Sequence, residues 1–128
     1  MALYAAGYAE RRKVSLVNYA DIQAKHFLYL LSRNTEVHYF VHPLIAKLAG
    51  SKKKSDQALV ECLYEYLLNG CSISATVRSM NLHRNTLIYR IQKLQELFSM
   101  QFDSVPAEFR FSLLVSCMIV RAEALEEV

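Results

Sequence analysis

The sequence predicts an all-α fold, a multi-helix bundle, and three observations lead to that prediction. The 128 residues include only three Gly and two Pro, too few for the turns of an all-β fold. Apolar residues make up 53% of the chain and charged residues 21%, which is typical of a globular protein and excludes a disordered one. From Asp21 onward, apolar residues recur at the i, i+3, i+4, i+7 spacing of amphipathic helices.

The first 20 residues are predicted to differ from the remainder. Residues 1–13 predict a short Ala-rich helix, and residues 14–19 are the one good strand candidate in the chain. Because one strand cannot form a sheet, it either pairs with something outside this chain or belongs to the edge of a preceding domain. We interpret residues 1–20 as a linker or as the remnant of that domain, and residues 21–128 as a helical domain.

Helical periodicity continues from residue 21 to residue 50. Asp21 is expected to cap a helix whose apolar stripe comprises Ala24, Phe27, Leu28 and Leu31. Thr35 is expected to cap the following segment, and Gly50 to end it as the C′ residue. An interior proline costs about 3 kcal/mol and disfavours helix at the residue before it. Pro43 therefore predicts a kink or two short helices.

Two further helices are expected on either side of the central segment. Ser55 is expected to cap the first and Gly70 to close it, with a buried side made of Leu59, Cys62, Leu63, Tyr66 and Leu67. The second begins near Pro106, a favoured first helical residue, and runs towards the C-terminus. Between Phe109 and Val120 this helix is apolar on more than one face. It is therefore buried either at the centre of the domain or against a partner subunit.

The segment from Ser72 to Phe98 predicts a helix-turn-helix, with residues 73–97 as the motif and 83–97 as its recognition helix. Ser72 is a good N-cap for a short helix that places Ile73, Val77 and Met80 on one face. Asn81 and Leu82 supply the turn, and the second helix starts at about His83 or Arg84. Its buried stripe is expected to be Leu87, Ile91, Leu94 and Phe98.

The opposite face of that second helix is polar and cationic. Asn85, Tyr89 and Gln92 lie opposite the apolar stripe, and no Asp or Glu occurs from Tyr66 to Gln95. A solvated helix more often carries an acid in its first turn, where the helix dipole favours negative charge. The absence of an acid there suits an incoming phosphate, although the polar face of two packed amphipathic helices could simply meet water.

The string LHRNTLIYRI, with Ile73, Thr76 and Leu82 at their spacings, resembles the C-terminal helix-turn-helix of the PucR/CdaR family. These are bacterial regulators of purine catabolism, sugar-diacid use and related pathways. The run VSLVNYADI resembles the end of the degenerate GGDEF-like domain that precedes this module, and residues 22–120 resemble its helical remainder. The resemblance implies a Fis-like helix-turn-helix. Two departures are Val77, where a small Ala is expected between the helices, and Met80, which replaces Leu.

The resemblance also implies roles for individual residues. The candidates for contacts with base edges are Arg84, Asn85 and Tyr89, and those for phosphate contacts are Thr86, Arg90, Lys93 and Arg78. His83 is expected either to contact a phosphate or to cap the helix. A motif shared among regulators of different operators sets docking more than sequence choice. Ile88 and Gln92, which the family signature leaves free, are therefore expected to decide more of the specificity.

These features predict a sequence-specific transcriptional regulator that binds double-stranded DNA, with the recognition helix in the major groove. We expect a homodimer, because one recognition helix reads too few base pairs for operator-level selectivity. The alternative is a helical protein–protein interaction or dimerisation module that has lost its DNA affinity. It is suggested by the apolar last helix, the net charge of only +3 and Val77.

Other classes of function find little support in the sequence. No nucleophile stands beside a His at a motif-like spacing and no Gly-rich phosphate loop occurs, so an enzyme is not expected. The three cysteines lack zinc-ligand spacing and are expected to be free thiols; no metal or cofactor is expected. No membrane span or secretory signal is evident. We expect a bacterial cytoplasmic protein whose effector, if it has one, binds a domain outside this chain.

Overall fold

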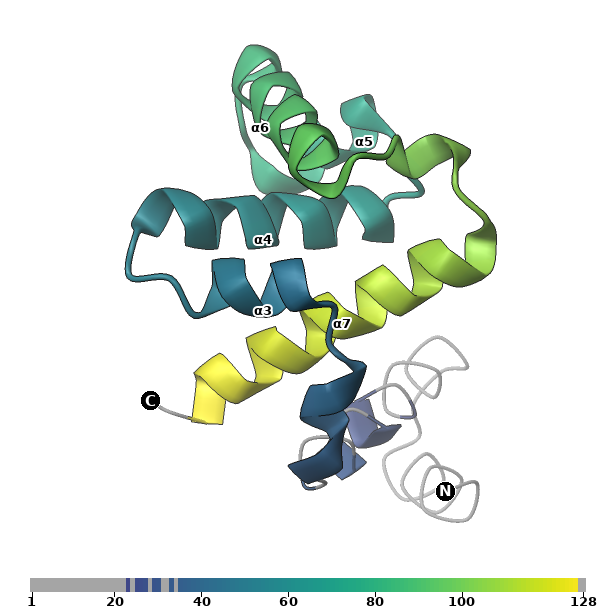
Figure 1. Cartoon of the computed structure of the whole chain (residues 1–128). Helices are drawn as coiled ribbons and strands as arrows, with labels where there is room; N and C mark the ends of the chain where they lie inside the picture. Colours follow the sequence, from purple (N-terminus) through teal and green to yellow (C-terminus); the bar gives the residue numbers. More distant parts are fainter. Residues whose placement is uncertain (1–22, 24, 28, 31–32, 34, 127–128) are drawn as a thin grey trace, which may run out of the picture. The chain divides into compact units, whose positions relative to one another are not determined.

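The structure is a computed structural model that describes residues 23, 25–27, 29, 30, 33 and 35–126 (Figure 1). It divides the chain into two compact units, residues 1–37 and residues 38–128, and each is described by itself. Among the described residues every regular element is helical, which confirms the all-α prediction. The predicted helix at 1–13, the predicted strand at 14–19 and the predicted boundary at residue 20 lie outside the described residues.

In the first unit, the described residues between 23 and 30 are helical, as the periodicity predicted. The expected cap Asp21 and the stripe residues Ala24, Leu28 and Leu31 lie outside the described residues. Phe27, the remaining member of that stripe, is exposed. The Arg33 guanidinium donates a hydrogen bond to the Tyr29 hydroxyl at 2.7 Å, so the end of this helix carries an exposed cation.

Pro43 separates two short helices, as its position predicted. The 3-10 helix η1 spans Thr35–Phe40, with Thr35 inside it as its first residue, and α3 spans Pro43–Ala49. Pro43 lies in the first turn of α3, where a missing N–H leaves no intrahelical bond unmade. Gly50 ends α3, as predicted, but it is the C-cap and not the C′ residue. Its φ is −81°, because its N–H still donates to the Ala46 carbonyl within a right-handed last turn.

The helix α4 spans Lys54–Leu68. Ser55 was predicted as its N-cap, but Lys53 takes that place. The reason lies in Ser51, whose Oγ accepts the Lys53 N–H at 3.2 Å and thereby turns the chain into the helix before Ser55 is reached. The predicted buried side of the helix is confirmed in full, and Gly70 follows its end at a φ of +64°.

The last helix, α7, spans Ala107–Glu126. It begins one residue later than predicted, because the Pro106 carbonyl already accepts the N–H groups of Phe109 and Arg110, which makes Pro106 a flanking residue. Its apolar residues pack against α3 and α4, with Leu113, Val115, Cys117 and Ile119 buried. The helix was expected to be buried either at the centre of the domain or against a partner subunit, and its packing places it at the centre of the unit. Phe111 is nevertheless 62% exposed.

Within residues 38–128 the helices form two layers joined by α4 (Figure 1). On one side of α4 lie α3 and α7, and on the other lie α5 (Ile73–Met80) and α6 (Arg84–Phe98). A short 3-10 helix, η2 (Phe102–Ser104), leads from α6 to α7. The Phe102 ring stands edge-on to Phe98 and Tyr66, at centroid distances of 5.5 and 6.5 Å. This aromatic cluster fixes the end of α6 against α4.

No helix in the described part of the chain combines the length and the apolar composition that crossing a bilayer requires. The three cysteines are free thiols, as expected, with Cys62 and Cys117 buried and Cys71 half-buried.

Candidate nucleic-acid interface

The first helix of the motif, α5, begins where the sequence predicted. The Ser72 Oγ accepts the Ala75 N–H at 3.2 Å, which is an N-cap hydrogen bond. Ile73, Val77 and Met80, the apolar residues predicted to share one face, are half-buried, and Thr76 is the residue of α5 without solvent exposure. Thr76 tolerates burial because its hydroxyl donates to the Ser72 carbonyl at 2.6 Å and so leaves no donor unpaired.

A small polar network sets the position of α5 on α4. The Ser79 hydroxyl donates to the Glu65 carboxylate at 3.1 Å, and the Asn69 amide donates to the Ser79 hydroxyl at 3.1 Å and to the Glu65 carbonyl at 2.7 Å. These contacts hold the second half of α5 against the C-terminal end of α4. This network was not predicted from the sequence, because Glu65, Asn69 and Ser79 form no recognisable motif.

The turn of the motif is tight and left-handed at one residue. Asn81 has a φ of 53° and a ψ of 43°, a conformation that asparagine adopts more readily than most residues. The Leu82 N–H closes the turn on the Val77 carbonyl at 3.3 Å, and the Leu82 side chain is half-buried. The turn residues are those predicted. Together they fix the angle at which the second helix leaves the first.

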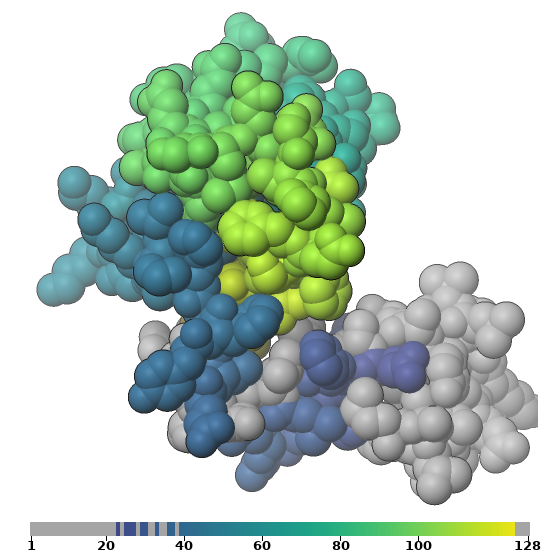
Figure 2. All heavy atoms as spheres, turned by 45° about the vertical axis from the view of Figure 1, so that its right-hand side comes forward, coloured from purple at the N-terminus to yellow at the C-terminus, as the bar shows by residue number. Residues whose placement is uncertain are grey.

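The second helix, α6, starts at Arg84 with His83 as its N-cap. The Nδ1 atom of His83 accepts the Asn85 N–H at 3.2 Å, so of the two roles considered for His83 the cap is the one seen here. All four residues of the predicted apolar stripe are buried, and this expectation is confirmed. That stripe holds α6 on α4 and α5 and leaves the opposite face to solvent (Figure 2).

The exposed surface of α6 from residue 84 to residue 93 is called the recognition face below. Its exposed members are those predicted to face outward: Arg84, Asn85, Thr86, Tyr89, Gln92 and Lys93. Glu96 and Leu97 are exposed further along the helix. Tyr89 is the most open of the apolar-bodied residues there, with 64% of its surface exposed. Arg78 is exposed on α5. The structure therefore brings seven of the ten predicted site residues to the surface of α5 and α6, and His83 is exposed at the junction.

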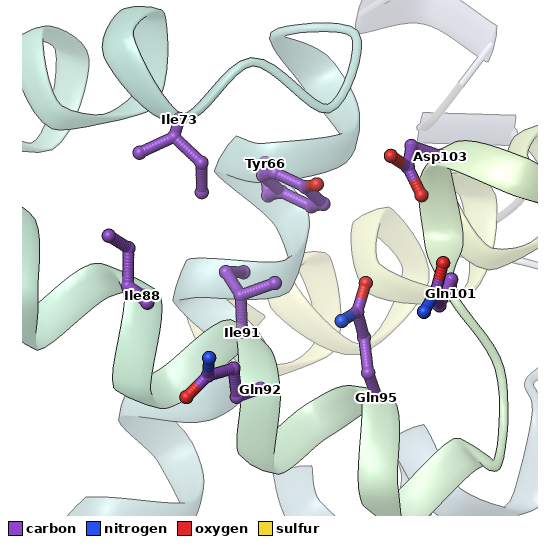
Figure 3. A pocket seen from close by; sticks show the side chains of 8 residues that line it. All are labelled: Tyr66, Ile73, Ile88, Ile91, Gln92, Gln95, Gln101 and Asp103. Atoms are coloured by element: carbon purple, nitrogen blue, oxygen red, sulfur yellow. The ribbon is translucent and has the colours of Figure 1, made fainter.

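Ile88 and Arg90 are placed differently from the rest of the set. The Arg90 guanidinium turns towards α4, where Nη1 lies 3.5 Å from the Cys62 Sγ, and the residue is half-buried. Ile88 is half-buried at the edge of a shallow cavity of about 290 Å³ (Figure 3). Both residues flank the recognition face instead of lying at its centre.

The cavity joins the recognition face to the interior of the unit. Its lining comprises Tyr66, Ile73, Ile88, Ile91, Gln92, Gln95, Gln101 and Asp103. Figure 3 shows the isoleucines on one side, Gln95, Gln101 and Asp103 on the other, and Gln92 next to Ile91. The Gln95 Oε1 accepts the Phe102 N–H at 3.3 Å and ties α6 to η2. Gln92 is thus both an exposed residue of α6 and a wall of this cavity.

The electrostatics of the interface favour an anion. The first turn of α6 contains no acidic residue, so its N-terminal N–H groups and Arg84 present positive charge without a compensating carboxylate. In the described part of the chain, no group of three or more His, Cys, Asp or Glu side chains is arranged to hold a metal ion. Burial raises the pKa of Cys117 to about 12 and also raises the pKa of Cys71, so both thiols are protonated at neutral pH. The residues of this interface offer hydrogen bonding and positive charge.

Comparison with known proteins places this geometry in a family. The family of the PucR C-terminal helix-turn-helix domain matches residues 59–119, which extend from α4 through α5 and α6 into α7. The chain is 35% identical over 74 residues to the purine catabolism regulatory protein of Bacillus subtilis (strain 168), covering 58% of this chain and 14% of that protein. It is 28% identical over 81 residues to the proline-responsive transcriptional activator PutR of the same organism, covering 63% of this chain and 20% of that protein.

The chain therefore spans 14% and 20% of the lengths of these two relatives, both of which are named as transcriptional regulators. No solved structure matches the chain. The matched segment contains the N-cap at Ser72, the left-handed turn at Asn81 and the whole of the recognition face. In residues 59–119, the chain carries the C-terminal helix-turn-helix domain of the PucR family of transcriptional regulators.

Proposed function

We propose that this chain is the DNA-binding module of a bacterial transcriptional regulator, with α6 in the major groove of duplex DNA. One observation carries the proposal: α6 buries an unbroken apolar stripe while its opposite face exposes amide, hydroxyl and cationic groups without a carboxylate in its first turn. A helix of this kind fits the width of the major groove, where base edges offer donors and acceptors.

The proposed base contacts lie at the start of α6. Asn85 carries a carboxamide, which pairs with the N6 and N7 atoms of adenine, and Arg84 carries a guanidinium, which pairs with the O6 and N7 atoms of guanine. Tyr89 follows one turn later with an exposed phenol. All three side chains are exposed, so no rearrangement of the domain is needed for them to reach a groove.

The proposed phosphate contacts surround that centre. Thr86 and Lys93 are exposed on α6, and Arg78 is exposed on α5. Arg90 reaches a phosphate only if its guanidinium leaves the Cys62 thiol. Such contacts set the register of the helix on DNA without reading sequence.

His83 can serve both of the roles considered for it. Its Nδ1 accepts the Asn85 N–H, so in a neutral imidazole the proton resides on Nε2. An exposed Nε2–H is a donor that a phosphate oxygen can accept, and the cap at the other nitrogen orients it. The same hydrogen bond therefore starts α6 and prepares a phosphate contact.

Ile88 and Gln92 are the proposed specificity residues. The exposed carboxamide of Gln92 can read a base edge, and the half-buried side chain of Ile88 can contact a thymine methyl group. Both also line the cavity beside α6, so their positions depend on how α5 and η2 pack. Regulators that share the surrounding motif can differ in operator through these two positions.

We further propose that the module acts as a homodimer in the bacterial cytoplasm. A single recognition helix contacts only a few base pairs, whereas two copies about one helical turn of DNA apart read two half-sites. Any effector would bind a domain other than residues 21–128, and residues 1–20 would be the linker or remnant that connects to it.

A second candidate is a protein interaction module that has lost its DNA affinity. Two observations favour it: Phe111 is 62% exposed on α7, and Leu97 is 45% exposed near the end of α6. A salt titration separates the two functions. DNA binding weakens steeply with salt, because each neutralised phosphate contributes about −0.9 to the slope of log K against log salt, whereas apolar docking does not.

The decisive experiment selects bound duplexes from a random-sequence pool and then measures their affinity by fluorescence anisotropy. Asn85→Ala should weaken binding to the selected duplex, whereas Gln23→Ala, which removes an exposed carboxamide outside α6, should not. Failure to enrich any duplex, or binding that is indifferent to salt, would overturn the proposal in favour of the interaction module.

A further inference from the structure

Four exposed lysines surround the turn between α3 and α4, outside the interface described above. They are Lys47, Lys52, Lys53 and Lys54, called the α3–α4 lysine cluster below. In the described part of the chain, none of their ammonium groups pairs with a carboxylate. We propose that this cluster is a second contact with the DNA backbone, on the flank of α6 opposite α5. The inference rests on the proposed function and names a further part of the same partner's binding surface.

The turn that carries the cluster is held by hydrogen bonds. The Ser51 Oγ accepts the Lys53 N–H at 3.2 Å and donates to the Asp56 carboxylate at 2.7 Å. The Gln57 side-chain amide donates to the Ser51 carbonyl at 3.0 Å. Asp56, the nearest carboxylate along the chain, is therefore engaged by Ser51. These hydrogen bonds hold the backbone of the turn in place, so binding a phosphate there would cost mainly the conformational entropy of the lysine side chains.

The order of contacts along α4 places the cluster on the free flank of α6. α6 contacts α4 at Cys62, where the Arg90 guanidinium lies 3.5 Å from the thiol, and α5 contacts α4 at Glu65. Lys54 is at the other end of the helix. At 1.5 Å per residue, Lys54 lies about 12 Å along the helix axis from Cys62, on the side away from Glu65. Figure 1 shows the same order, with the α3–α4 turn and α5 at opposite ends of α4.

Duplex DNA supplies phosphates on both flanks of a helix that lies in its major groove. The groove is about 12 Å wide, and a phosphate strand borders each side. Arg78 on α5 is proposed to contact one strand. The cluster stands on the other side of α6 at a distance comparable with the groove width, and extended lysine side chains add several ångströms of reach. Cations on both flanks would clamp the duplex over the recognition face.

The N-terminus of α4 adds to the positive potential at this point. α4 begins at Lys54, and the side chain of its N-cap residue Lys53 makes no capping hydrogen bond. The helix dipole adds to the charge of the lysines, and the Asp56 carboxylate in the first turn of α4 partly offsets it. A phosphate is the partner that this combination suits, because point charges on flexible stems bind a backbone of repeating anions without demanding one base sequence.

The test compares salt dependence among charge variants of the full chain. Binding to a fluorescein-labelled 30-bp duplex of mixed sequence is measured by anisotropy between 50 and 200 mM KCl. Lys52→Gln/Lys53→Gln/Lys54→Gln should flatten the slope of log K against log salt by about 2 to 3, since each lost phosphate contact removes about 0.9. The affinity at 0.1 M salt should fall by about tenfold or more.

Two controls separate a local contact from general effects. Lys52→Arg/Lys53→Arg/Lys54→Arg keeps the charge and should keep the wild-type slope. Ser104→Glu/Ala107→Glu/Ala124→Glu lowers the net charge by the same amount at exposed sites on η2 and α7, and should change the slope much less. Circular dichroism should show the same helix content in all variants, because every replaced side chain is exposed.

The outcomes distinguish this inference from the proposed function. A glutamine variant with the wild-type slope, beside an Arg84→Gln variant that binds more weakly, would overturn the lysine contact and leave the proposed function standing. An arginine variant as weak as the glutamine variant would also overturn it, because the loss would then come from the turn and not from charge. A wild-type chain that binds no duplex would overturn the proposed function itself.

Discussion

The Nδ1 atom of His42 accepts the Leu44 N–H at 3.1 Å and so caps α3, while the His42 ring lies 5.0 Å from the Phe98 ring, centroid to centroid. One side chain thereby links the start of α3 to the end of α6. The link requires a neutral imidazole, because a protonated Nδ1 cannot accept a hydrogen bond. Burial lowers the pKa of His42 below its ordinary value of 6.5.

Stability is therefore expected to fall when the pH drops below about 6.5. The folded state holds His42 neutral at a pH where the unfolded chain has begun to bind a proton, so protons favour unfolding. The stabilising term is complete above pH 6.5 and is lost as the pH falls towards the pKa of the folded state. Urea unfolding at pH 7.5 and 5.5 measures it, and His42→Asn, which keeps a capping oxygen, should show a smaller difference between the two pH values.

Ile91→Ala and Asn85→Ala should separate stability from recognition. Ile91 is buried and Asn85 is exposed on the opposite face of the same helix. Removing the Ile91 side chain should cost about 2–5 kcal/mol of unfolding free energy through the cavity it leaves. Asn85→Ala should change stability by less than about 0.5 kcal/mol. Thermal melts in which Asn85→Ala lowers the stability strongly and Ile91→Ala does not would contradict the orientation of α6.

Asn85→Ala should instead act on DNA. If its carboxamide reads an adenine, the variant loses about 1–3 kcal/mol of binding to a selected duplex. Binding to mixed-sequence DNA should change much less, because the phosphate contacts remain. Equal losses on both kinds of duplex, measured by anisotropy at one salt concentration, would make Asn85 a backbone contact.

Because Asn81 is left-handed, position 81 is expected to tolerate glycine and to disfavour a β-branched residue. Asn81→Gly should be neutral or nearly so, because glycine adopts a φ of 53° without strain. Asn81→Val should cost about 1–2 kcal/mol, since a β-branched residue is disfavoured there. Urea titration measures both changes. A valine variant as stable as wild type would show that the turn has another conformation in solution.

The thiols should differ in accessibility. Cys62 and Cys117 are buried, whereas Cys71 is half-buried, so a thiol reagent should label one cysteine in the native protein and all three in urea. Because the pKa of Cys71 is raised, chiefly by burial, labelling should be slower than for a free thiol and should accelerate as the pH rises. Cys71→Ser should abolish the native-state reaction, and persistence of labelling in that variant would mean that a buried thiol opens to solvent.

The sequence predicted the central motif well because its signals are local. The stripe of Leu87 and Ile91 follows from helical geometry alone, and Ser72 caps a helix through a hydrogen bond that spans three residues. Such features depend on neighbours in sequence. The same holds for Pro43, whose missing N–H divides a helix in any tertiary setting.

Helix ends and side-chain placements that depend on distant contacts could not be predicted. Ser55 is a suitable N-cap residue, but the Ser51 Oγ accepts the Lys53 N–H and turns the chain into the helix before Ser55 is reached. Arg90 belongs to the cationic set by its position in the helix, yet its guanidinium turns towards the Cys62 thiol of α4, and no pattern in the sequence indicates that contact. Thr76 is buried through a hydrogen bond to Ser72, whereas helical periodicity assigns burial to its apolar neighbours.

The contacts of His42 also bear on how short a self-folding fragment can be. The match to the PucR helix-turn-helix family starts at residue 59, yet two earlier residues belong to the packed unit. The His42 N–H donates to the Ser116 hydroxyl at 3.1 Å, and Ile45 is fully buried. A fragment cut to the matched region would lack α3, and the residues of α7 that pack against α3 would be exposed to water. A minimal fragment that folds independently should therefore include all residues from His42 onward.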